Sequence, residues 1–212
     1  MAKVSSVIGL VAATVGLMGA SAAHSATLSG SVAVDNTATV YLSSDLIASI
    51  GEEVLTNASG WSSASTFSGA AISGSTMYLL VDATNGYSLA MFAGDFNIAG
   101  SGYQFANGTT SLSTNLNIAD WMTSATSFAT ATSAPVLGGA NPNGSAWAWG
   151  TLPVAGQSIW AYSTDGASGP GHAYFVATLT SVTAVPEPTT GALLASGIAG
   201  LVMLARRRRN NA

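Results

Sequence analysis

Residues 26–184 of this 212-residue chain are predicted to form an all-β fold, an antiparallel β-sandwich. Three observations predict it. Short stretches alternate apolar with polar residues, and turn residues separate these stretches. A third is that no long stretch with helical spacing stands out. The segment is long enough for one domain that buries roughly two thirds of its unfolded surface. Because the chain has no cysteine, stability must come from a hydrophobic core rather than from disulfides.

The expected strands follow in order along the domain. Residues 31–34 and 38–42 flank a turn or bulge at residues 35–37. Residues 77–82 and 87–92 flank Asn85-Gly86, a dipeptide typical of tight hairpin turns. The alternation over residues 172–182 predicts the last strand.

Two segments are harder to assign. Residues 45–55 place four apolar side chains at helical spacing, but Gly51 interrupts them, and we interpret the segment as a strand. Residues 111–134 are mostly small and polar around Trp121, which is typical of a long loop or of weak edge strands. Trp61 and Trp160 are expected in the core.

The residues that follow the domain, 185–212, have three parts. Val185-Pro186-Glu187-Pro188 precedes an uncharged apolar stretch at 189–205, and Arg206, Arg207, Arg208 and Arg209 follow it. As a helix this stretch would span about 25 Å, somewhat less than a hydrocarbon core of about 30 Å. Flanking arginines can reach the interface and would hold their end in the cytoplasm. The segment is therefore predicted to be a transmembrane helix.

This order of Pro-Glu-Pro, apolar stretch and arginine cluster resembles the PEP-CTERM sorting signal. The resemblance implies recognition and cleavage by an exosortase in an exopolysaccharide-producing Gram-negative bacterium. It also implies transient anchoring in the inner membrane, followed by release to the cell surface or the medium. The alternative is an uncleaved single-span anchor with a chance Pro-Glu-Pro sequence.

Residues 1–25 are predicted to be a secretory signal peptide handled by the Sec translocon. Lys3 precedes an uncharged apolar run at 4–20, which ends in small residues. Cleavage after Ala22 or after Ser25 is compatible with these residues, and we favour Ser25. A retained N-terminal membrane helix is the alternative.

All five basic residues, Lys3 and the four arginines, lie in these two targeting segments. The domain between them has a formal charge of −8, carried by Asp35, Asp45, Glu52, Glu53, Asp82, Asp95, Asp120 and Asp165. Since lysine and arginine supply most of the affinity for phosphate backbones, we expect no nucleic-acid binding. Polyanionic polysaccharides are disfavoured for the same reason.

The domain is predicted not to be an enzyme. His172 is its only histidine, and we interpret it as a partly exposed residue that opens the last strand. The sequence has neither a Gly-x-Ser-x-Gly elbow nor a zinc-binding histidine pair. Glycoside hydrolysis needs only two carboxylates, so a glycan-active hydrolase is kept as a distant third hypothesis.

Two binding sites are hypotheses. Asp35, Asn36, Asp82 and Asn85 offer the oxygen ligands that a structural calcium ion prefers; no other cofactor is expected. Asn141, Asn143, Trp147 and Trp149 combine amides with aromatic rings, the chemistry that binds neutral sugars. The alternative, which we favour, is that the two tryptophans simply belong to the core.

A further similarity concerns the domain itself. Asp35-Asn36 before Tyr41-Leu42, then Trp61, and later Ile159-Trp160, resembles the galactose-binding-like β-sandwich, a jelly roll, of many PEP-CTERM proteins. The chain departs from that pattern by inserting residues 43–58.

These features together predict an exported, exosortase-processed structural protein of the envelope or extracellular matrix, without catalytic activity. Biofilm or exopolysaccharide is its expected setting. A module that binds neutral carbohydrate through Trp147 and Trp149, with exopolysaccharide as partner, is the alternative.

Overall fold

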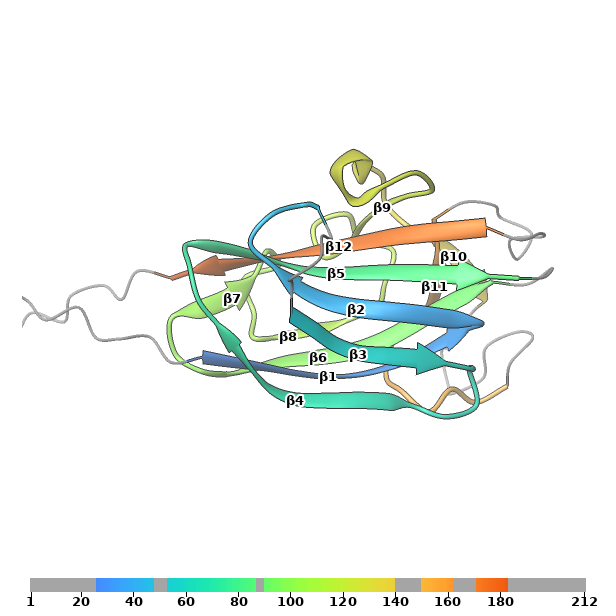
Figure 1. Cartoon of the computed structure of the whole chain (residues 1–212), viewed down its shortest axis with the longest axis horizontal. Coiled ribbons are helices and arrows are strands. Elements are labelled where there is room, and N and C mark those ends of the chain that lie inside the picture. Colours follow the sequence, from blue (N-terminus) through green and yellow to red (C-terminus); the bar gives the residue numbers. More distant parts are fainter. Residues whose placement is uncertain (1–25, 48–52, 87–89, 140–149, 162–170, 183–212) are drawn as a thin grey trace, which may run out of the picture.

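A computed structural model describes residues 26–47, 53–86, 90–139, 150–161 and 171–182. They form two antiparallel sheets that face each other as a sandwich (Figure 1). The predicted all-β sandwich is therefore confirmed. Within the described ranges no helix is both long and apolar enough to cross a membrane, and the predicted signal peptide and transmembrane helix lie outside them.

Within the described residues each sheet has six strands. Sheet A runs in the order β10-β11-β6-β1-β4, with β8 on β6, and sheet B in the order β3-β2-β5-β12-β7, with β9 on β12. The strands of sheet A are β1 (Ala26–Asp35), β4 (Ser65–Ile72), β6 (Met91–Gly100), β8 (Ser111–Ser113), β10 (Val136–Gly139) and β11 (Ser158–Trp160). Those of sheet B are β2 (Thr37–Ser43), β3 (Glu53–Ser59), β5 (Thr76–Asn85), β7 (Tyr103–Phe105), β9 (Met122–Ser124) and β12 (Gly171–Ser181).

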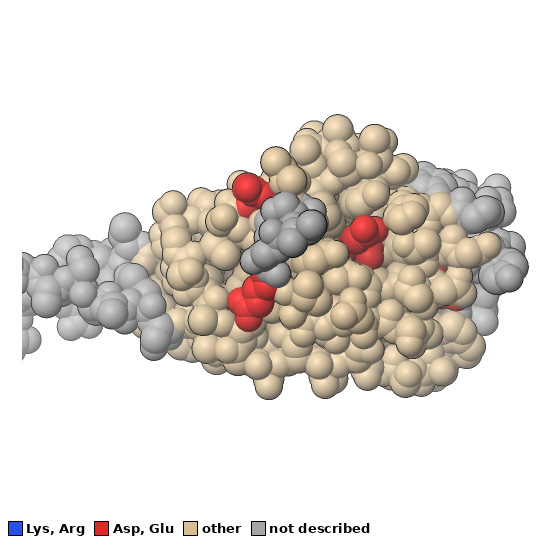
Figure 2. Space-filling model, viewed as in Figure 1, with Lys and Arg blue, Asp and Glu red and all other residues tan. Residues whose placement is uncertain are grey.

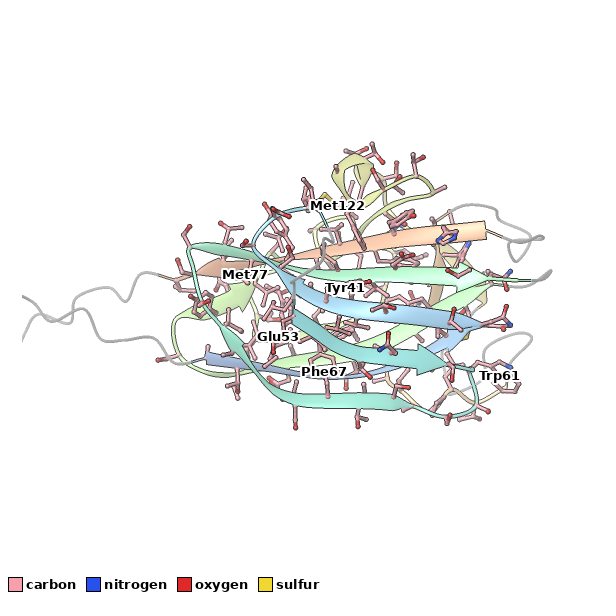
Figure 3. All side chains as sticks on the ribbon, in the orientation of Figure 1. Tyr41, Glu53, Trp61, Phe67, Met77 and Met122 are labelled. Atoms are coloured by element: carbon pink, nitrogen blue, oxygen red, sulfur yellow. The ribbon has the colours of Figure 1, made fainter. Side chains whose placement is uncertain are left out.

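The main core lies between the sheets and is built around aromatic rings. Trp121, which is fully buried, packs against Phe92 and Phe96 with ring centroids 5.7 Å away and against Phe175 at 6.5 Å. Trp160 is also buried, as predicted, and lies 5.9 Å from Phe175. Trp61 does not belong to this core: it lies in the loop after β3 and is 37% exposed (Figure 3).

The two expected turns are crossings between the sheets. Asn36, in the middle of the turn expected at residues 35–37, separates β1 in sheet A from β2 in sheet B. The hairpin predicted at Asn85-Gly86 is wrong, because β5 pairs in sheet B and β6 in sheet A. Asn85 is buried, and the Gly86 N–H donates to Asn36 Oδ1 at 2.6 Å. This hydrogen bond connects the end of β5 to the crossing between β1 and β2. A turn dipeptide reports a reversal of direction, not which sheet the next strand joins.

The strand predicted over residues 45–55 is wrong in its first part. Ser43 Oγ accepts the Asp45 N–H at 3.0 Å and Asp45 Oδ1 accepts the Ile47 N–H at 2.8 Å, so side chains close a turn after β2. The strand β3 begins only at Glu53. Residues 48–52 lie outside the described residues.

Residues 111–134 contain the short strands β8 and β9 and a 3₁₀ turn, η1 (Phe128–Thr130), in agreement with weak edge strands. The last strand, predicted over residues 172–182, is confirmed as β12. Ala26 of β1 pairs with Gly100, and Ser181 of β12 pairs with Tyr103. The N-terminal end of β1 and the C-terminal end of β12 thus lie at the same end of the sandwich, the left end in Figure 1.

Candidate functional site

The outer face of sheet B carries two rows of polar and aromatic side chains. One row crosses the strands through Asn57, Thr39, Asp82, Tyr174 and Ser124, and the next through Ser59, Thr37, Thr84 and His172. Ala38, Ala83 and Ala173, which separate these rows along the strands, are buried. Because side chains alternate between the faces of a strand, both rows must point outward.

His172 and Asp82 lie at the centre of these rows. His172 Nδ1 is 3.2 Å from Asp82 Oδ1 and 3.4 Å from Thr84 Oγ1. An ionised carboxylate can only accept, so Nδ1 carries the proton of the shorter bond. The side chains are 52% and 32% exposed, so water screens the pair and its contribution to stability is small. The prediction of a partly exposed histidine that opens the last strand is confirmed.

Tyr174 extends the aromatic surface beside His172. The two rings are nearly parallel, with 15° between their planes and 6.0 Å between their centroids. Phe128 of η1 meets the Tyr174 ring edge-on at 5.1 Å. Thr39 Oγ1 donates to Asn57 Oδ1 at 3.0 Å in the same row. Hydroxyl, amide and carboxylate groups therefore lie beside two parallel aromatic rings.

An apolar cluster bounds this site. Leu80 and Val176 also point to the outer face of sheet B, yet both are buried because Phe128 and Ala131, after β9, pack over them. Tyr41, Tyr78 and Leu46 line the edge of this cluster. The outer face is thus divided into a covered apolar part and an open polar part.

Burial and the Asp82 carboxylate both raise the pKa of Tyr174 above its ordinary value near 10. The pKa of Tyr174 is thus higher in the folded than in the unfolded protein. Its contribution to stability is complete at pH values below the unfolded-state pKa, and it is lost as the pH rises through the folded-state pKa. We therefore expect Asp82→Asn to shift Tyr174 ionisation to lower pH, because its carboxylate disfavours the tyrosinate. Ultraviolet titration, with Tyr174→Phe used to identify the signal of that ring, measures this shift. Identical titrations of the wild type and Asp82→Asn would contradict it.

The four residues proposed for calcium do not form one cluster. Asn36 Nδ2 donates to Asp35 Oδ1 at 2.6 Å, and Asn36 Oδ1 accepts the Gly86 N–H, beside the buried Asn85. Asp82 lies instead on the outer face of sheet B with His172. In the part of the chain that the structure describes, no three His, Cys, Asp or Glu residues come close enough to hold a metal. Asp35 and Asn36 take part in closing the crossing between the sheets.

The residues proposed for sugar binding, Asn141, Asn143, Trp147 and Trp149, lie outside the described residues, as do the residues of the sorting signal. The rows around Asp82 and His172 were missed at the sequence level. Alternation in residues 172–182 was visible and places His172 and Tyr174 on one face. The sequence alone did not reveal which strand pairs with this one, and it is this pairing that brings Asp82 beside His172 and Tyr174.

The described surface is acidic and sparsely charged. Figure 2 shows a few carboxylates on this face, among side chains that are mostly uncharged. Neither lysine nor arginine occurs between residues 26 and 184. A surface of this kind has no cationic groups with which to hold an anionic polymer.

Comparison with known proteins identifies one segment of the chain. Residues 184–209 match the model of the PEP-CTERM protein-sorting motif. Searches of curated proteins and of solved structures find no significant match. The chain carries a PEP-CTERM sorting motif directly after its β-sandwich, and it is a secreted or cell-surface protein targeted to an exosortase.

Proposed function

We propose that the sandwich is a non-catalytic structural component of the bacterial envelope or extracellular matrix. The observation that carries this proposal is the direct junction between the domain and its address: β12 ends at Ser181, and the sorting motif begins at residue 184. The last strand is a full member of sheet B, since it pairs with β5 from Gly171 to Thr180. The domain that the sorting motif directs to the exosortase is therefore the sandwich itself.

The chemistry of the described surface supports a structural role. Its polar groups are mostly hydroxyls and amides, and the one described histidine is half exposed and held by Asp82. Several large aromatic side chains, a residue type that supplies binding energy at many interfaces, lie in the core instead: Trp121, Trp160, Phe92 and Phe175 are all buried. These features suit a stable structural domain outside the cell.

Deletion of the gene, followed by complementation, tests this function. We expect the deletion strain to lose biofilm or floc cohesion and the wild-type gene to restore it. A His172→Ala gene should restore it equally, because a structural component does not need the only histidine of the domain as an acid or base. Normal cohesion in the deletion strain would contradict the structural role. Failure of a well-secreted His172→Ala protein would indicate that His172 itself takes part in catalysis or in binding.

A second candidate function, binding of neutral exopolysaccharide, is favoured by the parallel rings of His172 and Tyr174 beside Asp82. Flat rings cover the apolar faces of sugars, while carboxylates and amides bond to sugar hydroxyls. If the site binds glycan, Tyr174→Ala should weaken binding of the producing strain's neutral polysaccharide by about tenfold, the loss of one aromatic contact. Calorimetry measures the affinity.

The matched controls separate two possible glycan sites. Trp147→Ala with Trp149→Ala tests the segment proposed from sequence, and Thr180→Ala, elsewhere on β12, should change nothing. Loss of binding only in the double tryptophan variant would assign the glycan to residues 140–149 instead of to sheet B. No detectable binding by the wild-type protein would remove this candidate.

A further inference from the structure

The Asp82 carboxylate has one oxygen engaged and one open. Its Oδ1 accepts from His172 Nδ1 at 3.2 Å, and its Oδ2 makes no hydrogen bond with the described residues. The side chain is 32% exposed on the outer face of sheet B. Because carboxylate oxygens form their strongest hydrogen bonds with charged donors, Oδ2 can hold a cationic group.

Asp82 is also the only acid in the two polar rows of sheet B, whose other members carry hydroxyls, an amide or aromatic rings. Between residues 26 and 184 the chain has eight acids and neither lysine nor arginine. The domain as a whole therefore attracts cations, and these rows offer them one carboxylate rather than a cluster. A ligand with a single positive charge on each unit fits this arrangement.

Tyr174 lies directly opposite Asp82. The strands β12 and β5 pair at these two positions, and both side chains are on the outer face of sheet B. Side chains at such positions have Cβ atoms about 4.5–5.5 Å apart. A ring-shaped ligand that packs on Tyr174 thus has its substituents within reach of Asp82. The His172 ring, nearly parallel to that of Tyr174, extends the same surface.

The surroundings of Asp82 favour a sugar over a basic peptide. The strand β5 lies between β2 and β12, so a peptide cannot add to it as a further strand. The row through Asp82 continues to Thr39 and Asn57, whose hydroxyl and amide groups suit sugar hydroxyls. An amino sugar combines the flat ring, the hydroxyls and the single ammonium group that these side chains match.

We propose that Asp82 and Tyr174 form a subsite for an amino sugar with a free ammonium group, as found in a partly deacetylated hexosamine polysaccharide. The Tyr174 ring covers the apolar face of the sugar, and Asp82 Oδ2 accepts a hydrogen bond from the ammonium group. The proposal rests on the glycan-binding candidate described above, because it uses the same site. It adds the chemical group that the site selects.

Two oligosaccharides of equal length provide the test: a glucosamine oligomer and its fully N-acetylated form. Calorimetry with the secreted protein should give an affinity about fivefold higher for the glucosamine oligomer, the effect of one exposed charge pair. Asp82→Asn should remove this preference and still bind the acetylated form. Asp95→Asn is the matched control, because it removes the same charge from an exposed position on sheet A. It should keep the preference.

The possible failures are distinguishable. Wild-type protein that binds both oligomers equally would overturn the selection of an amine and leave the glycan-binding candidate intact, whereas protein that binds neither would overturn both. Equal loss of preference in Asp82→Asn and Asp95→Asn would show only a general attraction of an acidic domain for cations. Equal affinity for an oligolysine would show the same, and either result would overturn the inference.

Nuclear magnetic resonance of the wild-type protein covers the case in which Asp82→Asn fails to fold. His172 is the only histidine between residues 26 and 184, so its imidazole signals report on this site. These signals should shift when the glucosamine oligomer is added, and they should shift less at high salt, because ions screen exposed charges. Binding of the glucosamine oligomer without any change in these signals would place the amine elsewhere and overturn the inference.

Discussion

Replacing Trp121 by alanine should lower the free energy of unfolding by about 3–5 kcal/mol, the range for deleting a buried tryptophan side chain. Trp121 is fully buried and contacts three core phenylalanines that come from both sheets: Phe92, Phe96 and Phe175. Its Nε1 also donates to the Ser113 carbonyl at 3.0 Å, so the substitution leaves that acceptor without this partner. Since small domains are stable by about 5–15 kcal/mol in total, much of the margin would disappear.

Trp61→Ala is the matched control for this prediction. The same side chain is removed, but Trp61 is 37% exposed and lies in the loop after β3. We expect a loss below about 1 kcal/mol, as for most surface substitutions. Urea unfolding of the secreted protein, followed by tryptophan fluorescence and circular dichroism, measures both values. Equal losses for the two variants would show that Trp121 does not hold the two sheets together.

The second large effect concerns release from the membrane. Substituting alanine for Pro186, Glu187 and Pro188 should leave most of the protein in the membrane fraction, because these residues are the Pro-Glu-Pro sequence within the matched sorting motif at 184–209. Asn210→Ala with Asn211→Ala is the control, since both residues lie outside the match. Immunoblots of membrane and medium fractions measure the distribution. Equal release of the triple variant and the control would mean that Pro-Glu-Pro is not the recognised element.

The sandwich could be predicted from the sequence because its evidence is local. Alternation over residues 172–182 determines which side of β12 is buried, and turn residues mark where strands end. The sorting signal could be predicted for a similar reason, because the Pro-Glu-Pro sequence, the apolar stretch and the arginines are contiguous in the chain. Both predictions needed no knowledge of which strands pair.

Apart from the local turn at residues 43–47, the errors depend on contacts between segments that are distant in the sequence. Asn85-Gly86 indicates a reversal, but β5 and β6 join different sheets, and only the complete topology decides this. Trp121 lies in a polar stretch that favours a loop, yet the packing of both sheets around it makes it the centre of the core. The polar rows of sheet B were missed because Asp82 and His172 are ninety residues apart and meet only when β5 pairs with β12.

The intact mass of the native extracellular protein tests the central claim most directly. If an exosortase processes this chain, the secreted form has lost the segment after the Pro-Glu-Pro sequence, and no peptide from residues 206–209 remains attached to the domain. If the mass of the secreted protein still includes Arg206 to Arg209, the chain keeps an uncleaved anchor and the account of its delivery is wrong.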